Sequence, residues 1–215
     1  MDHVHATGTF VKFGGEMFRM EARLYFRGGS GKNLLLIGMN PGSSILAHGK
    51  ERDLKLAGEG EYITGEIEID STMKHIVQIM DEACPDFNGT LYIVNLFNVR
   101  CGNMDAAIKR YTTLRAKNIY LPYLTTDFKA YMNEHSFSSV WLGWSQRNES
   151  NINKRKKLVK RILSASKPLI PPTTLVAKYK DDDQGNIHVW HFRPLLQSHA
   201  TLYRNYVVPL LREIS

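Results

Sequence analysis

This chain has little cysteine and no long apolar run. Its 215 residues include two cysteines, Cys84 and Cys101, which are far apart in the sequence. Two such thiols provide neither the paired ligands of a structural zinc site nor those of an iron–sulfur cluster, so we expect no metal and no cofactor. No apolar run approaches the ~20 residues of a membrane span, and no signal-peptide core is present. We therefore expect a cytoplasmic protein without a membrane partner.

The overall composition is that of an ordinary folded domain, with 43% hydrophobic and 23% charged residues. We expect one domain over residues 1–215, in which residues 1–30 form a β-hairpin extension and residues 33–215 form the core. The formal net charge of +7 favours an anionic partner, for which DNA is the first candidate. Much of the excess lies in residues 154–161, which are typical either of a solvated helix face or of a phosphate-binding patch.

The hydrophobic pattern predicts an α/β fold. Alternating residues on either side of Gly14-Gly15 indicate the hairpin, and apolar runs at 33–39, 90–97 and 138–144 indicate buried strands. Residues 45–69 are polar and predict an extended loop. Further strands are expected at 173–178 and 187–192, and helices at 71–84, 105–110, 121–135, 151–164 and 201–214, the last interrupted or ended by Pro209. This alternation predicts three α/β/α layers around a central, mostly parallel sheet of four to five strands.

Three polar side chains fall at the expected ends of strands, where open α/β sheets bind ligands. Asn40 follows the first buried strand in the turn Asn40-Pro41-Gly42-Ser43-Ser44, Asn95 lies within the second, and His191 follows Trp190 near the end of the last. Each has a structural alternative. Asn is a common turn residue, a buried Asn can bond a neighbouring loop, and a His among aromatic residues is often a satisfied core residue.

These segments resemble the uracil-DNA glycosylase superfamily. Residues 38–42 are similar to the first motif of its mismatch-specific branch, and residues 94–101 are similar to the second core strand of its cluster-containing branch, whose Asn reads the base. Residues 191–195 stand where that superfamily has a histidine-proline-serine segment and a DNA-penetrating loop. From about residue 18 to 200, the chain also resembles a bacterial and phage family, domain of unknown function 1643, which itself resembles the glycosylase fold. The motifs of that family appear here as Asn40-Pro41-Gly42, Asp70-Ser71-Thr72, Asn95-Leu96-Phe97 and His191-Phe192.

The resemblance implies a uracil-DNA glycosylase-like core and a role for each matching residue. Asn40 would hold a water, His191 would donate to the departing base, and Asn95 would pair with the edge of that base. A neutral amide cannot take a proton from water, so Asp70 becomes a candidate base, although a helix N-cap is its structural alternative. The remaining candidates are Phe97 and Tyr62 as stacking rings, and Ser43, Ser44, Arg193, Leu195, Leu196, Lys156, Lys157 and Lys160 as DNA contacts.

The sequence thus predicts a DNA-repair hydrolase that cleaves the N-glycosidic bond of a modified or mismatched base after flipping it out of the helix. Two alternatives stay open: a non-catalytic nucleic-acid-binding protein of the same fold, and an enzyme acting on a free nucleobase or nucleotide. Phe192 follows His191 where the superfamily has proline, and His199 competes for the histidine role. The two cysteines are too few for the cluster of the branch that the second motif resembles.

Overall fold

The computed structural model describes most of the chain, and its architecture is α/β. The described residues are 2–117, 131–132, 134–144, 147, 149–165, 174–176, 178–181, 187–189, 191–193 and 197–213. Most of the expected helix at 121–135 lies outside these ranges. No helix within them is long and apolar enough to cross a bilayer.

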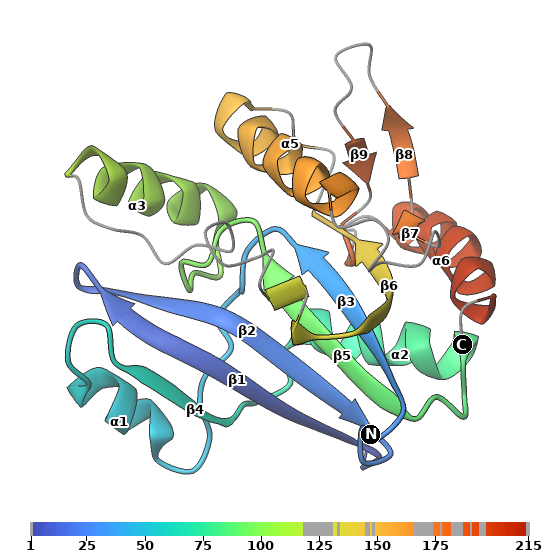
Figure 1. Cartoon of the computed structure of the whole chain (residues 1–215), viewed down its shortest axis with the longest axis horizontal. Coiled ribbons are helices and arrows are strands. Elements are labelled where there is room, and N and C mark those ends of the chain that lie inside the picture. The colour runs from blue at the N-terminus through green and yellow to red at the C-terminus, as the bar shows by residue number, and fades with distance from the viewer. Residues whose placement is uncertain are drawn as a thin grey trace.

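A seven-stranded sheet forms the centre of the molecule, in the order β4-β1-β2-β5-β3-β6-β7 (Figure 1). Its strands are β1 Val4–Phe13, β2 Glu16–Phe26, β3 Lys32–Gly38, β4 Tyr62–Glu66, β5 Gly89–Asn95, β6 Phe137–Leu142 and β7 Thr174–Val176. The four strands β5-β3-β6-β7 are parallel, whereas β4, β1, β2 and β5 pair antiparallel. The sheet is therefore mixed, and the expectation of a mostly parallel sheet of four to five strands is wrong.

The difference comes from the N-terminal hairpin and the segment after it. The free edge of β2 pairs with β5, as in Ala22↔Ile93, so the hairpin continues the main sheet. Residues 45–69, expected to be a loop, contain α1 Lys50–Leu56 and β4, which pairs with β1. The sequence does not predict these short elements, because their composition is polar. The edge strand β4 shows little alternation of apolar and polar residues, and Leu54 is the one buried residue of α1.

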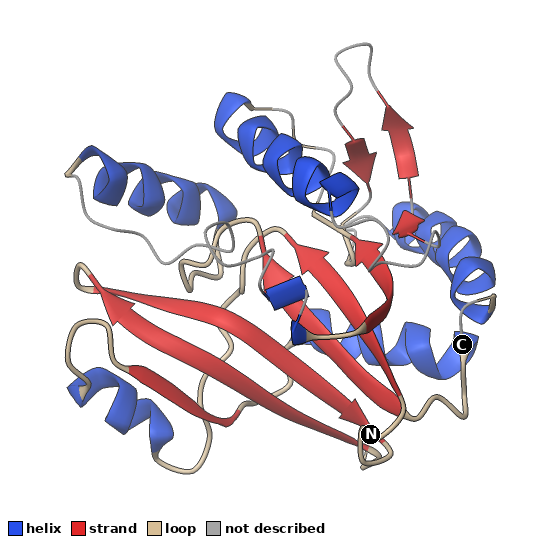
Figure 2. Ribbon diagram, viewed as in Figure 1, coloured by secondary structure: helices blue, strands red, loops and turns tan. Residues whose placement is uncertain are grey.

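Helices cover both faces of the sheet (Figure 2). One face packs α2 Ser71–Ala83 and α6 Gln197–Arg212, and the other packs α3 Met104–Ala116 and α5 Ser150–Ala165. Consecutive residues serve opposite faces: Leu36 packs with α2, and Leu35 packs with α3. The apolar run of β3 is thus buried on both sides, as its sequence predicts. α6 continues through Pro209, which corrects the expected interruption.

The last strands depart from the predicted sheet. β8 Lys178–Asp181 and β9 Ile187–Val189 form a separate antiparallel pair, so His191 does not follow a strand of the main sheet. In that sheet β3 lies between β5 and β6, and the chain leaves β3 toward β5 but leaves β6 toward β7. Connections that diverge in this way open a crevice at the carboxyl ends of the strands.

Candidate functional site

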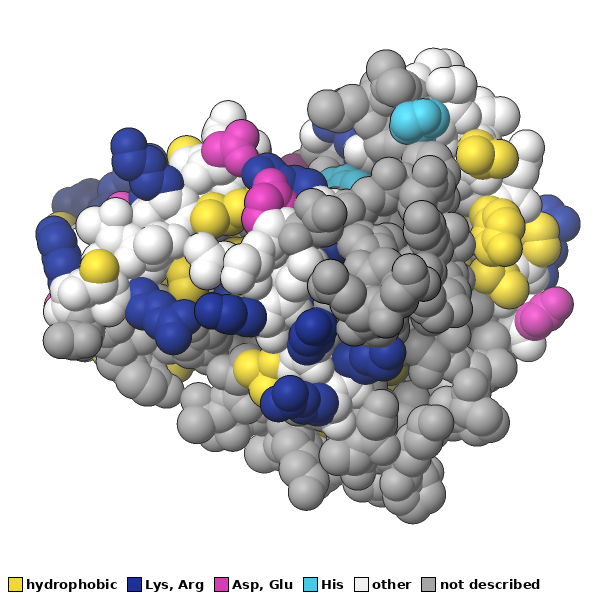
Figure 3. All heavy atoms as spheres, turned by 90° about the horizontal axis from the view of Figure 1, so that it is seen from above, with side chains coloured by type: hydrophobic (Ala, Val, Ile, Leu, Met, Phe, Trp, Pro, Cys, Tyr) yellow, Lys and Arg dark blue, Asp and Glu magenta, His cyan; other side chains and the backbone are white. Residues whose placement is uncertain are grey.

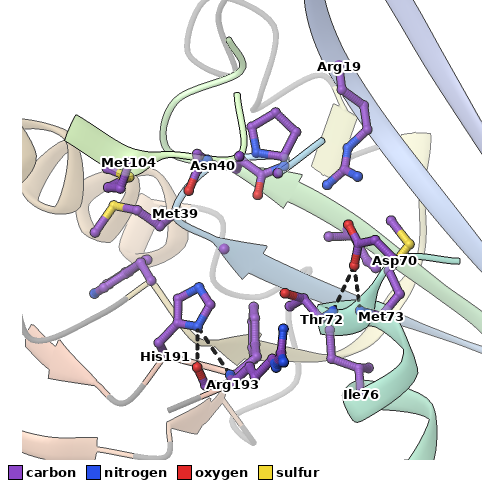
Figure 4. A pocket seen from close by; sticks show the side chains of 18 of the residues that line it. Arg19, Met39, Asn40, Asp70, Thr72, Met73, Ile76, Met104, His191 and Arg193 are labelled. Carbon is purple, nitrogen blue, oxygen red and sulfur yellow. Dashed lines mark hydrogen bonds between the residues drawn. The ribbon is translucent and has the colours of Figure 1, made fainter. Parts of the chain in front are cut away.

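A cleft of about 390 Å³ lies at the carboxyl ends of β3, β5 and β6. Its walls include Asn40, Asp70, Asn95 and His191, which come from four separate segments of the chain. Figure 4 shows three of them, Asn40, Asp70 and His191, around the cleft. The volume lies within the range of small-molecule sites, which pair apolar walls with a few polar groups. Four of the residues singled out in the sequence therefore line one cleft, at the edge of the sheet where ligands of α/β proteins bind.

Asn40 is held in the turn after β3 with its side-chain amide oriented. Its Nδ2 donates to the backbone oxygen of Cys101 at 2.7 Å. Gly42 has φ of 66°, a conformation that favours glycine, and it forms an isolated antiparallel bridge with Cys101. In the described part of the chain no hydrogen bond reaches Asn40 Oδ1. This carbonyl oxygen is the group that can accept a hydrogen bond from a water or a ligand.

Asp70 combines the two roles that its sequence position left open. It is the N-cap of α2, and its Oδ1 accepts from the backbone N–H groups of Thr72 and Met73, both at 2.9 Å. The carboxylate also lines the cleft (Figure 4). Its Oδ2 lies 3.3 Å from the position that a Cβ on Gly42 would occupy. The helix cap therefore brings a carboxylate against the turn that carries Asn40.

Asn95 spends part of its hydrogen-bonding capacity inside the protein. In the amide orientation that satisfies both ends, its nitrogen donates to the backbone oxygen of Asn40 at 3.1 Å, and its oxygen accepts from Arg19 Nη2 at 3.3 Å. The side chain is 2% exposed. Asn95 thus ties the turn to β5 and orients Arg19, as a buried amide must find partners. One N–H and one lone pair of the Asn95 amide are thus used within the protein. Only the second N–H and the second lone pair of the oxygen remain to bind a base.

Arg19 is the residue of this site that sequence reasoning missed. It comes from β2, is 2% exposed and lines the cleft, and its Nη1 donates to Ser44 Oγ at 2.6 Å. Burial lowers the pKa of its guanidinium to about 10, against the opposing effect of nearby Asp70. Its Nε is buried and has no hydrogen-bond partner in the described part of the chain. A buried cation thus faces the cleft.

A break in the β2 alternation turns Arg19 toward the cleft. The β1–β2 register shifts between the pairs Thr9↔Glu21 and Phe10↔Arg19, which leaves one extra residue in β2. On the N-terminal side of this shift in β2, Phe18 packs on the α3 face, and on its C-terminal side Ala22 packs on the α2 face. Arg19 consequently points to the α2 side, where Asp70 lies. Bulges re-aim side chains in this way, and simple alternation along a sequence does not reveal them.

His191 reaches the cleft through a docked aromatic neighbour. The ring of Phe192 is 2% exposed, lies edge-on to Trp141 at 5.2 Å between centroids and occupies the space over Gly143, where a Cβ would overlap it. Gly38 is also close, with its Cβ position 3.4 Å from the ring. The two glycines, at the ends of β3 and β6, therefore leave the space that the Phe192 ring occupies, and this packing holds the segment that carries His191.

The ring of His191 is held by its own turn. The backbone N–H of Arg193 lies 3.1 Å from Nδ1, and the Arg193 oxygen lies 3.2 Å from the same atom. The N–H donates to Nδ1 in the neutral tautomer that carries its proton on Nε2, whereas the carbonyl oxygen accepts from Nδ1 in the other tautomer. Burial lowers the pKa of His191 below its usual value. A neutral ring at the cleft is the expected state.

Other predicted site residues lie elsewhere. Phe97 is fully buried against Tyr111 and does not line the cleft, and Tyr62 is 59% exposed on β4, at the far edge of the sheet. Neither is positioned as a stacking ring, because Phe97 packs in the apolar core and Tyr62 lies on an edge strand. Leu195 and Leu196 lie outside the described residues. His199 is exposed on α6 and does not line the cleft, so His191 is the histidine of this site.

The predicted DNA contacts differ in whether their side chains are exposed at the cleft or buried in the protein. Arg193 lines the cleft, where its Nη1 donates to Ser71 Oγ, and Ser43 is exposed beside it near Gly102. Ser44 is buried and serves Arg19, which corrects its expected contact with DNA. Lys156 is 1% exposed and donates to the backbone oxygen of Arg147. The expectation of a surface contact at Lys156 is therefore wrong.

The basic surface is the remaining part of α5. Lys157 and Lys160 are exposed, in line with a solvated or phosphate-binding face. Seen from above in Figure 3, the described residues present more Lys and Arg side chains than Asp and Glu side chains. A surface of this kind attracts polyanions without selecting among them.

The described residues contain no group of three or more His, Cys, Asp and Glu side chains placed to bind a metal ion. Comparisons of the chain with protein-family models, with curated proteins and with solved structures give no match.

Proposed function

We propose that this protein is a DNA glycosylase-like hydrolase that cleaves the N-glycosidic bond of a modified or mismatched base in DNA. The observation that supports this proposal most is that Asn40, Asp70 and His191 line one cleft. Their chemistry suits a reaction in which positive charge develops on the sugar and negative charge develops on the leaving base. The helices on both faces of the sheet agree with the three-layer, uracil-DNA glycosylase-like core that the sequence resembles.

The proposed reaction begins with a water between Asn40 and Asp70. Asn40 Oδ1 accepts a hydrogen bond from this water and orients it, and the Asp70 carboxylate takes its proton as the oxygen bonds to C1′ of the sugar. The N-glycosidic bond breaks, and its electron pair goes to the base nitrogen. The Nε2–H of His191 donates to a carbonyl oxygen of the departing base and stabilises its negative charge.

The substrate base must leave the helical stack to enter the cleft, which costs a few kcal/mol. The exposed lysines of α5 and the rim arginine, Arg193, supply the attraction for phosphates that such binding uses. The buried cation at Arg19 favours a second candidate from the same cleft, an enzyme that acts on a free nucleotide.

The test is base excision by the purified chain on single- and double-stranded oligonucleotides that each carry one modified or mismatched base. Alkali then cuts the strand wherever a base has been released. We expect product from at least one oligonucleotide, and a loss of product in Asn40→Ala and in Asp70→Asn. The exposed Asp86 supplies a matched control, Asp86→Asn, which keeps wild-type activity.

The absence of product from every oligonucleotide, with Asn40→Ala indistinguishable from wild type, sinks the proposal. Salt-sensitive binding without any product supports the non-catalytic alternative, because loss of chemistry leaves the electrostatic contacts in place. Release of a base from free nucleotides alone supports the second candidate.

A further inference from the structure

We propose that Arg19 forms a phosphate-binding subsite at the floor of the cleft, so that the ligand of this protein presents a phosphate group there. This inference deepens the proposed function, and it rests on that function only in taking the cleft as the place where the ligand binds.

The first support is that the buried charge of Arg19 is energetically unfavourable. Arg19 is 2% exposed, and no ion pair joins it to a carboxylate in the described part of the chain. Its hydrogen-bond partners, Ser44 and Asn95, are neutral, and its Nε–H has no partner among the described residues. Burying a charge in this way is unfavourable unless an opposite charge joins it. A ligand that brings an anionic oxygen supplies what the protein itself leaves out.

The second support is that the protein fixes the orientation of the Arg19 guanidinium. The shift in the β1–β2 register turns Arg19 to the cleft side, and the bonds at 2.6 Å to Ser44 and 3.3 Å to Asn95 fix the plane of the group. In Figure 4 its guanidinium points toward the space between Asn40 and Asp70. A planar, oriented fork of N–H donors matches the oxygens of phosphate better than a lysine ammonium does.

The third support is the balance of charges around the cleft. Arg147 lines it but is paired with Asp105 and Glu149. Arg19 and Arg193 also line it, with hydroxyl and amide partners in place of carboxylates. Against these two cations the lining contains one carboxylate, that of Asp70. With His191 neutral, the residues that line the cleft carry excess positive charge, which an anionic ligand neutralises.

Asp70 makes a specific contribution to this subsite. Its Oδ1 is occupied by two backbone N–H groups of α2, and its charge acts on Arg19 without an ion pair between them. A carboxylate so close to the subsite repels a bound phosphate. Asp70→Asn removes that repulsion and keeps a good N-cap, so phosphate binding tightens in this variant while hydrolysis is lost.

Two sources offer the same phosphate chemistry. One is the terminal phosphate of a free nucleotide, and the other is the backbone phosphate beside a flipped nucleotide in DNA. The experiment titrates the full chain by calorimetry with inorganic phosphate, a deoxynucleoside 5′-monophosphate, the nucleoside without phosphate and a single-stranded oligonucleotide. The variants are Arg19→Gln, Asp70→Asn and, as a matched control, Arg110→Gln, in which an exposed arginine paired with Glu16 is changed.

We expect phosphate and the nucleotide to bind, and the nucleotide to bind more tightly than the nucleoside. Arg19→Gln weakens binding about tenfold or more, because it removes charge-assisted hydrogen bonds. Asp70→Asn strengthens it about threefold to tenfold, and Arg110→Gln leaves it unchanged. Dependence on Arg19 for the mononucleotide identifies a free nucleotide as the source, and dependence for the oligonucleotide identifies the DNA backbone.

Equal affinities for nucleotide and nucleoside overturn the subsite, and so does an Asp70→Asn variant with unchanged phosphate affinity. The second of these results decides the matter even if Arg19→Gln fails to fold in a circular-dichroism measurement. Phosphate binding that follows these expectations without base release refutes the proposed function but leaves the subsite. Base release without phosphate binding refutes the subsite but leaves the proposed function.

Discussion

Among the arginine side chains that lie near carboxylates, Arg100 and Arg19 differ in whether the two charges form an ion pair. Arg100 and Glu51 form a closed pair in which two guanidinium nitrogens donate to the two carboxylate oxygens at 2.7 and 2.8 Å. Arg19 and Asp70 both line the cleft, yet Arg19 bonds Ser44 and Asn95, while Asp70 caps α2.

The difference separates a structural role from a functional one. In the closed pair each charge satisfies the other, and Glu51 also accepts from the backbone N–H of Leu46. The closed pair joins the start of α1 to the segment after β5. Its two charges bind each other and not a ligand. Arg19 and Asp70 form what we call the open pair. Here neutral groups of the protein hold both charges in place, which keeps the charges available to a substrate. A cleft residue whose pKa is strongly shifted, as that of Arg19 is by burial, is typical of functional sites.

The largest expected effect is on catalysis at the open pair. We expect Asp70→Asn to lower the rate of base release by about 10²–10⁴-fold, since a general base contributes that much to a reaction rate. The melting temperature changes little, because Asn is as good an N-cap as Asp. Single-turnover kinetics and thermal unfolding measure the two effects. An Asp70→Asn variant with wild-type rate contradicts the role of the open pair.

The next effect concerns the docking of His191 beside that pair. Gly143→Ala puts a methyl group into the space of the Phe192 ring, and overpacking of this kind costs about 1–3 kcal/mol. Displacement of Phe192 moves His191, so activity also falls. Urea denaturation and base-release assays check this result. Gly58→Ala is the control, because the nearest atom to its new Cβ is Glu61 Oε2 at 3.8 Å. Equal stability of both variants contradicts the docking.

Breaking the closed pair has a smaller effect, and on stability alone. Glu51→Gln leaves Arg100 without its carboxylate, which costs about 1–2 kcal/mol, below the value for a fully buried pair, because the two side chains are 20% and 15% exposed. The free energy of unfolding from urea titration measures this loss, and the base-release rate of the folded variant remains that of wild type. A loss of rate with unchanged stability reverses the assignment of the two pairs.

The smallest expected effect is a pH dependence of the closed pair. Burial raises the pKa of Glu51, but the hydrogen bond from Arg100 and other contacts outweigh it and hold the pKa below its usual value of 4.5. The unfolded chain therefore binds this proton first as the pH falls. The stabilisation is present above pH 4.5 and is lost as the pH falls through the lower pKa of the folded state. In urea titrations at pH values from above 4.5 downward, the free energy of unfolding falls less steeply with pH in Glu51→Gln than in wild type.

The sequence predicts the parallel part of the fold better than the antiparallel part. Continuous apolar runs marked β3, β5 and β6, because strands buried on both faces need apolar side chains throughout. The edge strand β4 lacks that pattern. The place of the hairpin beside β5 was also beyond prediction, since alternation predicts a strand but does not determine its neighbour.

In the candidate site, the strand-end rule located Asn40 and Asn95, and Asp70 became a candidate because a neutral amide such as that of Asn40 cannot take a proton from water. Arg19 was missed because its direction depends on an extra residue in β2, which no alternation reveals. Phe97 was misjudged because an aromatic residue after a strand suits a core as well as a ligand. The burial of Lys156 could not be read from a run of basic residues, of which one member faces inward.

The most direct test of the central claim compares Asp70→Asn with Glu51→Gln on one oligonucleotide from which the wild-type chain releases a base. The measurement is the amount of free base per enzyme in a single turnover. The account predicts that Asp70→Asn releases almost none while staying folded, and that Glu51→Gln releases base at the wild-type rate while unfolding at lower urea. Equal rates in the two variants contradict the claim that the open pair in the cleft is the site of chemistry.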